Sequence, residues 1–314
     1  MIEQDTVKLL RECDAGIKMG VYSIEEVLGD VNNGNFKQML EKANAENYAV
    51  MAINCFNLET ARAVIGAAEE EQAPIIINIF WEHLLTHSDS ELIAPLVKTL
   101  ANRASVNVAL NLDHGQEEDY LKKAIDDGFS SVMADMSRFE LEENIKRTRE
   151  IADYAHAHGA SIEGEIGCLG GSEGGKFTQE AMYTDPAQAK MFYERTDIDA
   201  LAISIGTSHG NYPEGVVPVF DFERLKKIKE LTNMPLVLHG GSGSGEDNII
   251  KAVACGINKI NVGCDFMNAN KNAAVKILER NKDINFYDLV DRTEQESVKL
   301  VEYYICLSGS ENKA

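Results

Sequence analysis

From residue 48 onward, short apolar runs rich in β-branched residues alternate with longer amphipathic segments that carry most of the charge. The apolar runs lie at residues 48–54, 74–80, 105–113, 130–135, 160–166, 199–205, 234–239 and 257–263. The segments between them, such as 58–72 and 222–231, repeat apolar residues at helical spacing. This alternation is typical of βα units around a parallel sheet, and eight repeats predict a (β/α)8 TIM barrel of the α/β class. A doubly wound sheet, which usually has about five to seven strands, is the alternative.

The segments outside the eight repeats complete the predicted domain organisation. A segment at 36–46 is expected to cover the bottom of the barrel before the first strand. Helical segments at 265–280 and 286–305 are expected to pack outside the barrel as additional C-terminal helices. Residues 1–34 form a partly amphipathic N-terminal extension, for which we expect packing or a subunit contact, with disorder as the alternative. The barrel is therefore expected to occupy residues 35–314 as one domain.

Charge and cysteine content exclude several classes of partner. The chain of 314 residues has a formal net charge of −21 and a pI near 4.7. Nucleic acid is bound by clustered Lys and Arg, so it is not an expected partner. The sequence shows no apolar run near the roughly 20 residues that span a bilayer, so a soluble protein with no membrane partner is expected. The six cysteines are dispersed without a CxxC pair and no signal-peptide pattern opens the chain, which favours a reduced, cytoplasmic location.

Three histidines stand at the predicted carboxyl ends of three strands, and each is followed by glycine. They are His114, His209 and His239. In a TIM barrel the side chains at these strand ends meet on one face, where active sites are built. Three imidazoles with an open fourth position suit a catalytic zinc ion, whereas packed, hydrogen-bonded histidines are the alternative. Asp113 directly precedes His114, so we expect its carboxylate to act as an acid or base beside the metal.

Two glycine-rich loops follow strand ends. The stretch PLVLHGGSGSGED, residues 235–247, changes at His239 from a strand-like run to four glycines and two serines. The backbone N–H groups of Gly210 and of 240–242 can approach an anion closely, which predicts a nest for a phosphate. The loop at 168–184 is longer than the other connections and is expected to be a lid. Its Glu173 is a candidate second acid or base, with a solvated loop charge as the alternative.

Seven motifs follow one another along the chain. They are LDHG (112–115), DDGFSSVMADMS (126–137), IEGEIGCLGG (162–171), YTDPAQAKMFYERTDIDALAISIGTSHGNY (183–212), PLVLHGGSG (235–243), GINKINVGCD (256–265) and GSENKA (309–314). In length and order they resemble the motifs of the class II, metal-dependent fructose-bisphosphate and tagatose-bisphosphate aldolases. The resemblance runs from about residue 36 to the last residue of the sequence. It implies a TIM barrel, a carbon–carbon lyase activity and a homodimer or larger homo-oligomer.

The resemblance also implies roles for individual residues. His114, His209 and His239 match the zinc ligands. Asp113 matches the residue that takes and returns the proton of the C4 hydroxyl, and Glu173 the loop base that exchanges a C3 proton of dihydroxyacetone phosphate. The residues implied to contact substrate are Asn54, Gly210, Gly240, Gly241, Ser242, Asn261, Gly263, Cys264 and Asp265, with Asn261 at the enediolate and the nest residues at the C1 phosphate. Asp135 and Glu165 resemble carboxylates near the metal and are candidates for a second divalent or monovalent cation.

The chain departs from the family pattern at several positions. Phe80 stands where the family usually has a serine that contacts phosphate, and Cys264 where it commonly has threonine. A frequent Asp-Pro-Arg triplet is replaced by residues 285–287, Asn-Phe-Tyr. Trp81, His83 and His87 gather beside Phe80, and we expect the two histidines to be ordinary polar or substrate-lining residues, with a metal pair four residues apart as the alternative.

The residues and the resemblance together predict a zinc-dependent aldolase. It would reversibly cleave a ketose 1-phosphate or ketose bisphosphate into dihydroxyacetone phosphate and an aldehyde through a zinc-stabilised enediolate. A small-molecule sugar phosphate is thus the expected substrate. Phe80 and Trp81 are expected to narrow or dry the pocket, which would suit an aldehyde without a phosphate. A sugar-phosphate-binding barrel without turnover and a zinc-dependent hydrolase on the same scaffold are the alternatives.

Overall fold

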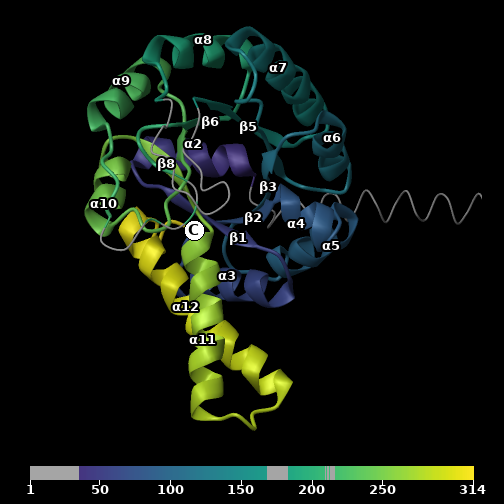
Figure 1. The fold of residues 1–314 in the computed structure, drawn as a ribbon. Coiled ribbons are helices and arrows are strands. Elements are labelled where there is room, and N and C mark those ends of the chain that lie inside the picture. The colour runs from purple at the N-terminus through teal and green to yellow at the C-terminus, as the bar shows by residue number, and fades with distance from the viewer. Residues whose placement is uncertain (1–34, 168–182, 209, 211, 213–215) are drawn as a thin grey trace, which may run out of the picture.

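The computed structural model is a barrel of strands surrounded by helices (Figure 1). It describes residues 35–167, 183–208, 210, 212 and 216–314. The predicted N-terminal extension lies outside these ranges, so the domain boundary near residue 35 stays a prediction. Within them, the helices are all too short or too polar to cross a membrane.

Eight parallel strands close the barrel in chain order. They are β1 (Val50–Cys55), β2 (Ile75–Phe80), β3 (Val108–Gly115), β4 (Ser131–Ala134), β5 (Ser161–Ile166), β6 (Ala200–Ile203), β7 (Leu236–Leu238) and β8 (Ile257–Val262). Each strand pairs with the next, and β8 pairs with β1. Every predicted apolar run overlaps one of these strands. The TIM barrel is therefore confirmed, and closure excludes the doubly wound sheet.

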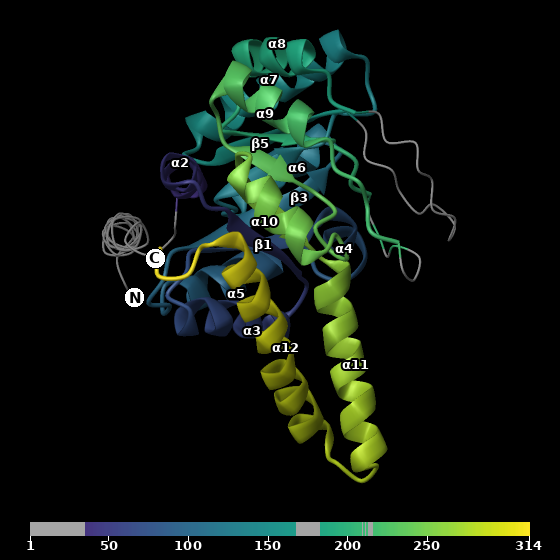
Figure 2. The ribbon, with the colours of Figure 1, turned by 90° about the vertical axis from the view of Figure 1, so that its left-hand side faces the viewer.

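Most of the helices cover the outer face of the barrel. The helices are α2 (Phe36–Glu46), α3 (Leu58–Glu70), α4 (Trp81–Thr86), α5 (Ser90–Ala101), α6 (Glu118–Asp126), α7 (Leu141–Ala157), α8 (Pro186–Thr196), α9 (Phe222–Thr232), α10 (Glu246–Ala254), α11 (Cys264–Arg280) and α12 (Phe286–Ser308). Of these, α2 closes one end of the barrel, whereas α11 and α12 extend beyond it (Figure 2). Side-chain caps define the first residues of several helices. Asp185, for example, accepts hydrogen bonds from two backbone N–H groups of the first turn of α8, and Pro186 needs no such partner.

The lower half of the barrel interior is mostly apolar and is closed by α2. Side chains alternate along each strand, so every second residue points inward. Small and branched inward residues such as Ala52, Ile76 and Ala109 form one buried cluster with Phe36 and Leu40 of α2. As expected from the sequence, the segment at 36–46 covers the end of the barrel where the strands begin (Figure 2).

The upper half of the interior is polar. Further along β2 and β3, the inward side chains are Asn78 and Asn111, and the Asn111 amide donates to Asn78 Oδ1 at 2.9 Å. Ser131 of β4 donates to Asn111 Oδ1 at 2.8 Å, so Asn111 is hydrogen-bonded to both neighbouring strands. This change from apolar to polar along the barrel axis marks the carboxyl ends of the strands as the functional end.

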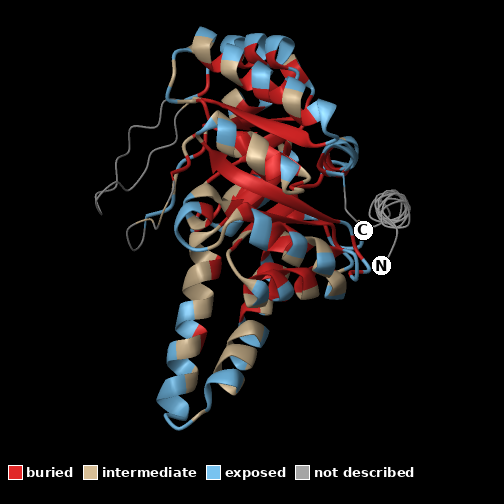
Figure 3. Ribbon diagram, turned by 90° about the vertical axis from the view of Figure 1, so that its right-hand side faces the viewer, coloured by how far each residue is buried: buried red, intermediate tan, exposed pale blue. Residues whose placement is uncertain are grey.

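The two C-terminal helices form an arm that extends beyond the barrel. Helices α11 and α12 pack against each other, and α12 also packs on α3 (Figure 2). Exposed residues continue along the outer part of the arm (Figure 3), where Phe286 is 79% and Tyr287 77% exposed. The predicted packing outside the barrel thus holds only for the part of the arm near the barrel.

A partly buried lysine predicts how stability changes with pH. Lys229 of α9 donates to the Met234 carbonyl at 2.8 Å and to Asn258 Oδ1 at 2.7 Å, and burial lowers its pKa from 10.5 to about 8. Between these two values the unfolded chain binds more protons at this lysine than the folded chain does, so folding becomes more favourable as pH rises. The free energy of unfolding of the wild type, relative to Lys229→Met, should therefore increase between about pH 7.5 and about pH 10 in urea titrations. An unchanged difference across this range would show that the ammonium is not destabilised by burial.

Candidate active site

The end of β3 carries two neighbouring residues to the same site. Alternation turns Asn111 and Asp113 into the barrel and would turn His114 outward. The pairing of β3 with β4 shifts register between Leu112 and Gly115, and His114 adopts a positive φ of 54°. A non-glycine residue rarely has this backbone conformation. Because of the irregularity, Asp113 and His114 both face the mouth of the barrel, which strand periodicity alone does not predict.

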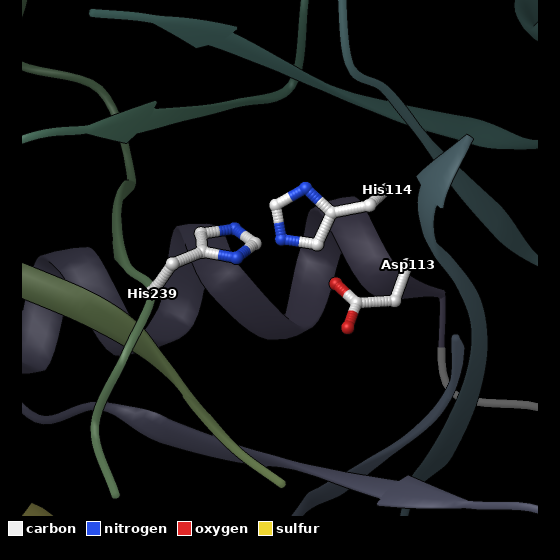
Figure 4. Close-up of side chains that lie close together, drawn as sticks. All are labelled: Asp113, His114 and His239. Carbon is white, nitrogen blue, oxygen red and sulfur yellow. The ribbon is translucent and has the colours of Figure 1, made fainter. Parts of the chain in front are cut away.

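Carboxylates fix the orientation of His114 and His239, the two predicted metal ligands that the structure describes. His114 Nδ1 lies 2.9 Å from Asp135 Oδ2, and His239 Nε2 lies 2.8 Å from Glu163 Oε1. These contacts direct Nε2 of His114 and Nδ1 of His239 toward a shared space beside the Asp113 carboxylate (Figure 4). Ligand atoms of the three residues lie within 4.8 Å of one another.

This donor set fits a zinc ion. Imidazole nitrogens and a carboxylate oxygen are zinc ligands, and histidine ligands are usually oriented by carboxylates on their other nitrogen. His114, at the end of β3, and His239, after β7, would hold the metal from opposite sides of the barrel mouth. His209, the third predicted ligand, lies outside the described residues.

Two amides hold the Asp113 carboxylate. Asn54 Nδ2 donates to Oδ2 at 2.8 Å, and Asn261 Nδ2 donates to Oδ1 at 2.9 Å. Burial would raise the pKa of Asp113, but the positive charges of His114, His239 and Lys259 and the Asn54 hydrogen bond outweigh it and hold the pKa below 3.8. Asp113 is therefore a buried, ionised carboxylate that is held in one orientation.

A buried ion pair lies behind His239. Lys259 Nζ is 2.7 Å from Glu163 Oε2, both side chains are fully buried, and the ammonium lies over the Phe36 ring. Glu163 thus binds Lys259 with one oxygen and His239 with the other. Sequence analysis assigned neither residue a role. The signal was available, because strand alternation places both charged residues inside the barrel, where a buried charge needs a partner.

Removing the lysine is expected to leave Glu163 as an uncompensated buried charge. Lys259→Met should lower the free energy of unfolding by about 3 to 5 kcal/mol in urea titrations. It should also weaken zinc binding by about 10- to 100-fold in a chelator competition, because Glu163 would no longer hold His239 in one orientation. The double variant Lys259→Met/Glu163→Gln removes both charges and should recover part of the stability. If the single variant bound zinc as tightly as the wild type, the pair would not position His239.

A second group of acidic residues surrounds His114. Its Nδ1 lies 3.8 Å from Glu165 Oε2, and Asp135, Glu165 and His114 offer ligand atoms within 4.8 Å of one another. Burial raises the pKa of Glu165 well above its ordinary value, and the Asp135 charge adds to this effect. Burial alone would raise the pKa of Asp135, but His114 and Ser137 hold it below its ordinary value. A cation at this group would offset the repulsion between two buried carboxyl groups.

The histidines and Asp113 open into a cavity of about 370 Å³. The described residues that line it are Asn54, Phe80, His83, Asp113, His114, Gly210, His239, Gly240, Ser242, Asn261, Gly263, Cys264, Met267 and Asn268. Most of the predicted substrate-contacting residues are among them. Met267 and Asn268 were not anticipated; they reach the cavity because α11 begins at its edge.

Two predicted substrate contacts lie beside the cavity and form internal hydrogen bonds. The Gly241 N–H donates to the Asn261 carbonyl at 3.0 Å. Asp265 Oδ2 accepts from the Tyr304 hydroxyl at 2.6 Å and from the Gly243 N–H at 2.9 Å. These hydrogen bonds therefore fix the conformation of the loop after β7, to which Gly241 belongs and which Asp265 contacts.

Glycine is required at the point where this loop meets its neighbour. Gly240 has a φ of 68°, and a Cβ built on it would lie 2.5 Å from the Ser208 carbonyl oxygen. Side chains are excluded there by both backbone conformation and space. The loops after β6 and β7 are thus in direct backbone contact and form one edge of the cavity.

The residues that cluster after β2 separate in the structure. His83 lines the cavity, and its ring contacts Phe80 and Phe56. The Trp81 ring packs against Tyr120, and Trp81 is not among the described residues of the cavity wall, contrary to the expectation that it would narrow the pocket. Glu173 and most of the predicted lid lie outside the described residues.

Comparisons with known proteins agree with this geometry. A family model described as "Fructose-bisphosphate aldolase class-II" matches residues 34–313. A fructose-bisphosphate aldolase of Geobacillus stearothermophilus is 38% identical over 256 residues, covering 81% of this chain and 88% of that protein. The crystal structure of the YdjI aldolase from Escherichia coli K12 is 32% identical with a TM-score of 0.79, covering 90% of this chain and 99% of that one. The fructose-bisphosphate aldolase of Campylobacter jejuni is 25% identical with a TM-score of 0.76, covering 88% and 95%.

Proposed function

Since the chain belongs to the class II fructose-bisphosphate aldolase family and is a carbon–carbon lyase, we propose that it cleaves a phosphorylated ketose reversibly into dihydroxyacetone phosphate and an aldehyde. The substrate class is a ketose 1-phosphate or ketose bisphosphate. The observation that carries the proposal is the group of His114, His239 and Asp113, which is buried at one end of a cavity edged by glycine loops.

In this proposal His114, His239 and His209 hold one zinc ion. Zinc, when bound, supplies electrostatic stabilisation of the negative charge that develops on the substrate as the bond breaks. Asp135 and Glu165 are proposed to hold a second cation beside His114. Asp135 and Glu163 keep the two described imidazoles in the orientation that metal binding needs.

Asp113 is proposed to move the proton of the C4 hydroxyl. In the cleavage direction it accepts this proton as the bond between C3 and C4 breaks, and in condensation it returns the proton. Its lowered pKa keeps it ionised, and Asn54 and Asn261 hold its oxygens in place. Asn261 is also proposed to contact the enediolate. Glu173 is proposed to exchange the C3 proton of dihydroxyacetone phosphate.

The glycine edge is proposed to bind the C1 phosphate. The contacts would come from the loops after β6 and β7, namely Gly210, Gly240, Gly241 and Ser242. Gly263, Cys264 and Asp265, at the start of α11, are proposed to contact other parts of the substrate. Backbone N–H groups can approach a phosphate closely where glycine leaves space. Burial raises the pKa of Cys264, so its thiol stays neutral and does not repel the anion. A homo-oligomer and a cytoplasmic location complete the proposal; they rest on the family and on the dispersed cysteines.

A cleavage assay tests the proposal. Zinc-loaded protein is incubated with a set of ketose 1-phosphates and ketose bisphosphates, and dihydroxyacetone phosphate is measured by its coupled enzymatic reduction. We expect release from at least one substrate, loss of release after chelation and recovery with zinc. Binding of the sugar phosphates without release would instead support the sugar-phosphate-binding barrel.

A further inference from the structure

The wall of the cavity near β2 is built of aromatic rings. Phe80 ends β2, and its ring centroid lies 6.1 Å from that of His114 and 5.8 Å from that of His83. The Phe56 ring in turn lies 5.8 Å from His83 and 5.4 Å from His87. These T-shaped contacts therefore form a continuous series that begins at the proposed metal ligand His114 and ends at His87. We call Phe80 and His83, which line the cavity, the aromatic wall; Phe56 contacts His83, and His87 contacts Phe56, away from the cavity lining.

The aromatic wall stands across the barrel from the glycine edge. In the closed order of eight strands, β2 is four places from β6 and three from β7. Gly210 follows β6 and Gly240 follows β7, whereas Phe80 and His83 belong to β2 and α4. A ketose whose C1 phosphate lies on the glycine edge and whose reacting carbons lie at Asp113 would extend its remaining carbons toward the aromatic wall.

The aromatic wall offers no cationic group to a second phosphate. Among the described residues that line the cavity there is no lysine or arginine. Burial lowers the pKa of His83, and the neighbouring His87 lowers it further, so the His83 imidazole is neutral near pH 7. A phosphate dianion placed against these rings would lose water without gaining an opposite charge, which is strongly unfavourable.

We propose that the aldehyde half of the substrate carries no phosphate, so that the substrate is a ketose 1-phosphate whose far end packs on Phe80 and His83. The inference rests on the proposed function. The C–H groups of an uncharged aldehyde can pack on the Phe80 ring. The imidazole of His83 can form a hydrogen bond with a hydroxyl group of the aldehyde. The aldol step is unchanged: the C3–C4 bond breaks, its electrons stay with the dihydroxyacetone phosphate half, and the C4 hydroxyl proton passes to Asp113.

The test compares aldehydes in the condensation direction. With zinc-loaded protein and dihydroxyacetone phosphate, kcat/KM is measured for glyceraldehyde, glycolaldehyde and lactaldehyde and for glyceraldehyde 3-phosphate. We expect the best uncharged aldehyde to exceed the phosphorylated one at least about tenfold. Phe80→Ser, which opens the wall to water, should reduce this ratio about tenfold. Trp81→Phe, beside it but packed on Tyr120, is the matched control and should leave the ratio unchanged.

Deuterium exchange at C3 of dihydroxyacetone phosphate, measured in the same samples, separates the two proposals. Absence of deuterium exchange in the zinc-loaded wild type would contradict the proposed function itself. With exchange intact, a preference for glyceraldehyde 3-phosphate, or condensation with none of the uncharged aldehydes, would overturn the inference. His83→Asn provides a second variant if Phe80→Ser does not fold, and it should raise KM for the uncharged aldehyde. If Phe80→Ser kept the wild-type ratio of kcat/KM values and His83→Asn kept the wild-type KM for the uncharged aldehyde, the aromatic wall would not select the aldehyde.

Discussion

Asparagine in place of Asp113 is expected to lower kcat for ketose cleavage by about two to four orders of magnitude while zinc stays bound. The substitution keeps the size of the side chain and one of the two hydrogen bonds that the carboxylate accepts from Asn54 and Asn261, but it removes the group that accepts the C4 hydroxyl proton. Steady-state kinetics with the best substrate from the cleavage assay would measure the loss. Metal analysis of the same sample would show whether the ion is retained.

Asp199→Asn is the matched control for this prediction. Asp199 is also buried and accepts the Ile162 N–H at 2.9 Å, but it precedes β6 and lies at the opposite end of the barrel. Its replacement should lower stability and leave kcat within about threefold of the wild type, since it is remote from the chemistry. If Asp113→Asn retained wild-type kcat, Asp113 would not be the proton acceptor.

Loss of either described histidine at the site is expected to remove both the metal and the activity. A metal that polarises a substrate oxygen contributes several kcal/mol to the rate, and each 1.36 kcal/mol is a factor of ten. His114→Ala and His239→Ala should therefore lower kcat/KM by about three orders of magnitude or more. Zinc content after dialysis against a weak chelator, measured by mass spectrometry, should fall in the same samples, and circular dichroism would verify that the barrel is folded.

His156→Ala controls for the removal of a partly buried histidine. His156 of α7 contacts Asp199 at 3.0 Å, far from the carboxyl ends of the strands. This variant should keep its zinc and its kcat/KM. Full zinc content and activity in His114→Ala would show that the carboxylate-oriented histidines are not metal ligands.

The barrel could be predicted from the sequence because its strands are buried on both faces. Each strand then appears as an apolar run, and the runs recur with helical segments between them. The ends of the strands were predicted less accurately. The apolar run at 105–113, for example, corresponds to β3 at Val108–Gly115. Strand ends depend on hydrogen-bonding partners in neighbouring strands, which the local sequence does not show. The projection of α11 and α12 could not be predicted, because amphipathic periodicity does not tell which surface a helix contacts.

The site was only partly predictable for a similar reason. Residues at strand ends can be read from the sequence, and the structure brings Asp113, His114 and His239 together as expected. The positive φ of His114 and the pairing of Glu163 with Lys259 depend on contacts between distant strands. The direction of the Trp81 ring depended likewise on a partner, Tyr120, that no local pattern identifies.

The central claim is that this cavity carries out metal-dependent carbanion chemistry on dihydroxyacetone phosphate. Deuterium exchange at C3 of this compound tests it most directly, because exchange requires the metal and the phosphate site but no aldehyde. We predict stereospecific exchange in the zinc-loaded protein, followed by NMR, that stops after chelation and returns when zinc is restored. Absence of exchange from folded, zinc-loaded protein, or exchange that persists after the metal is removed, would contradict the account.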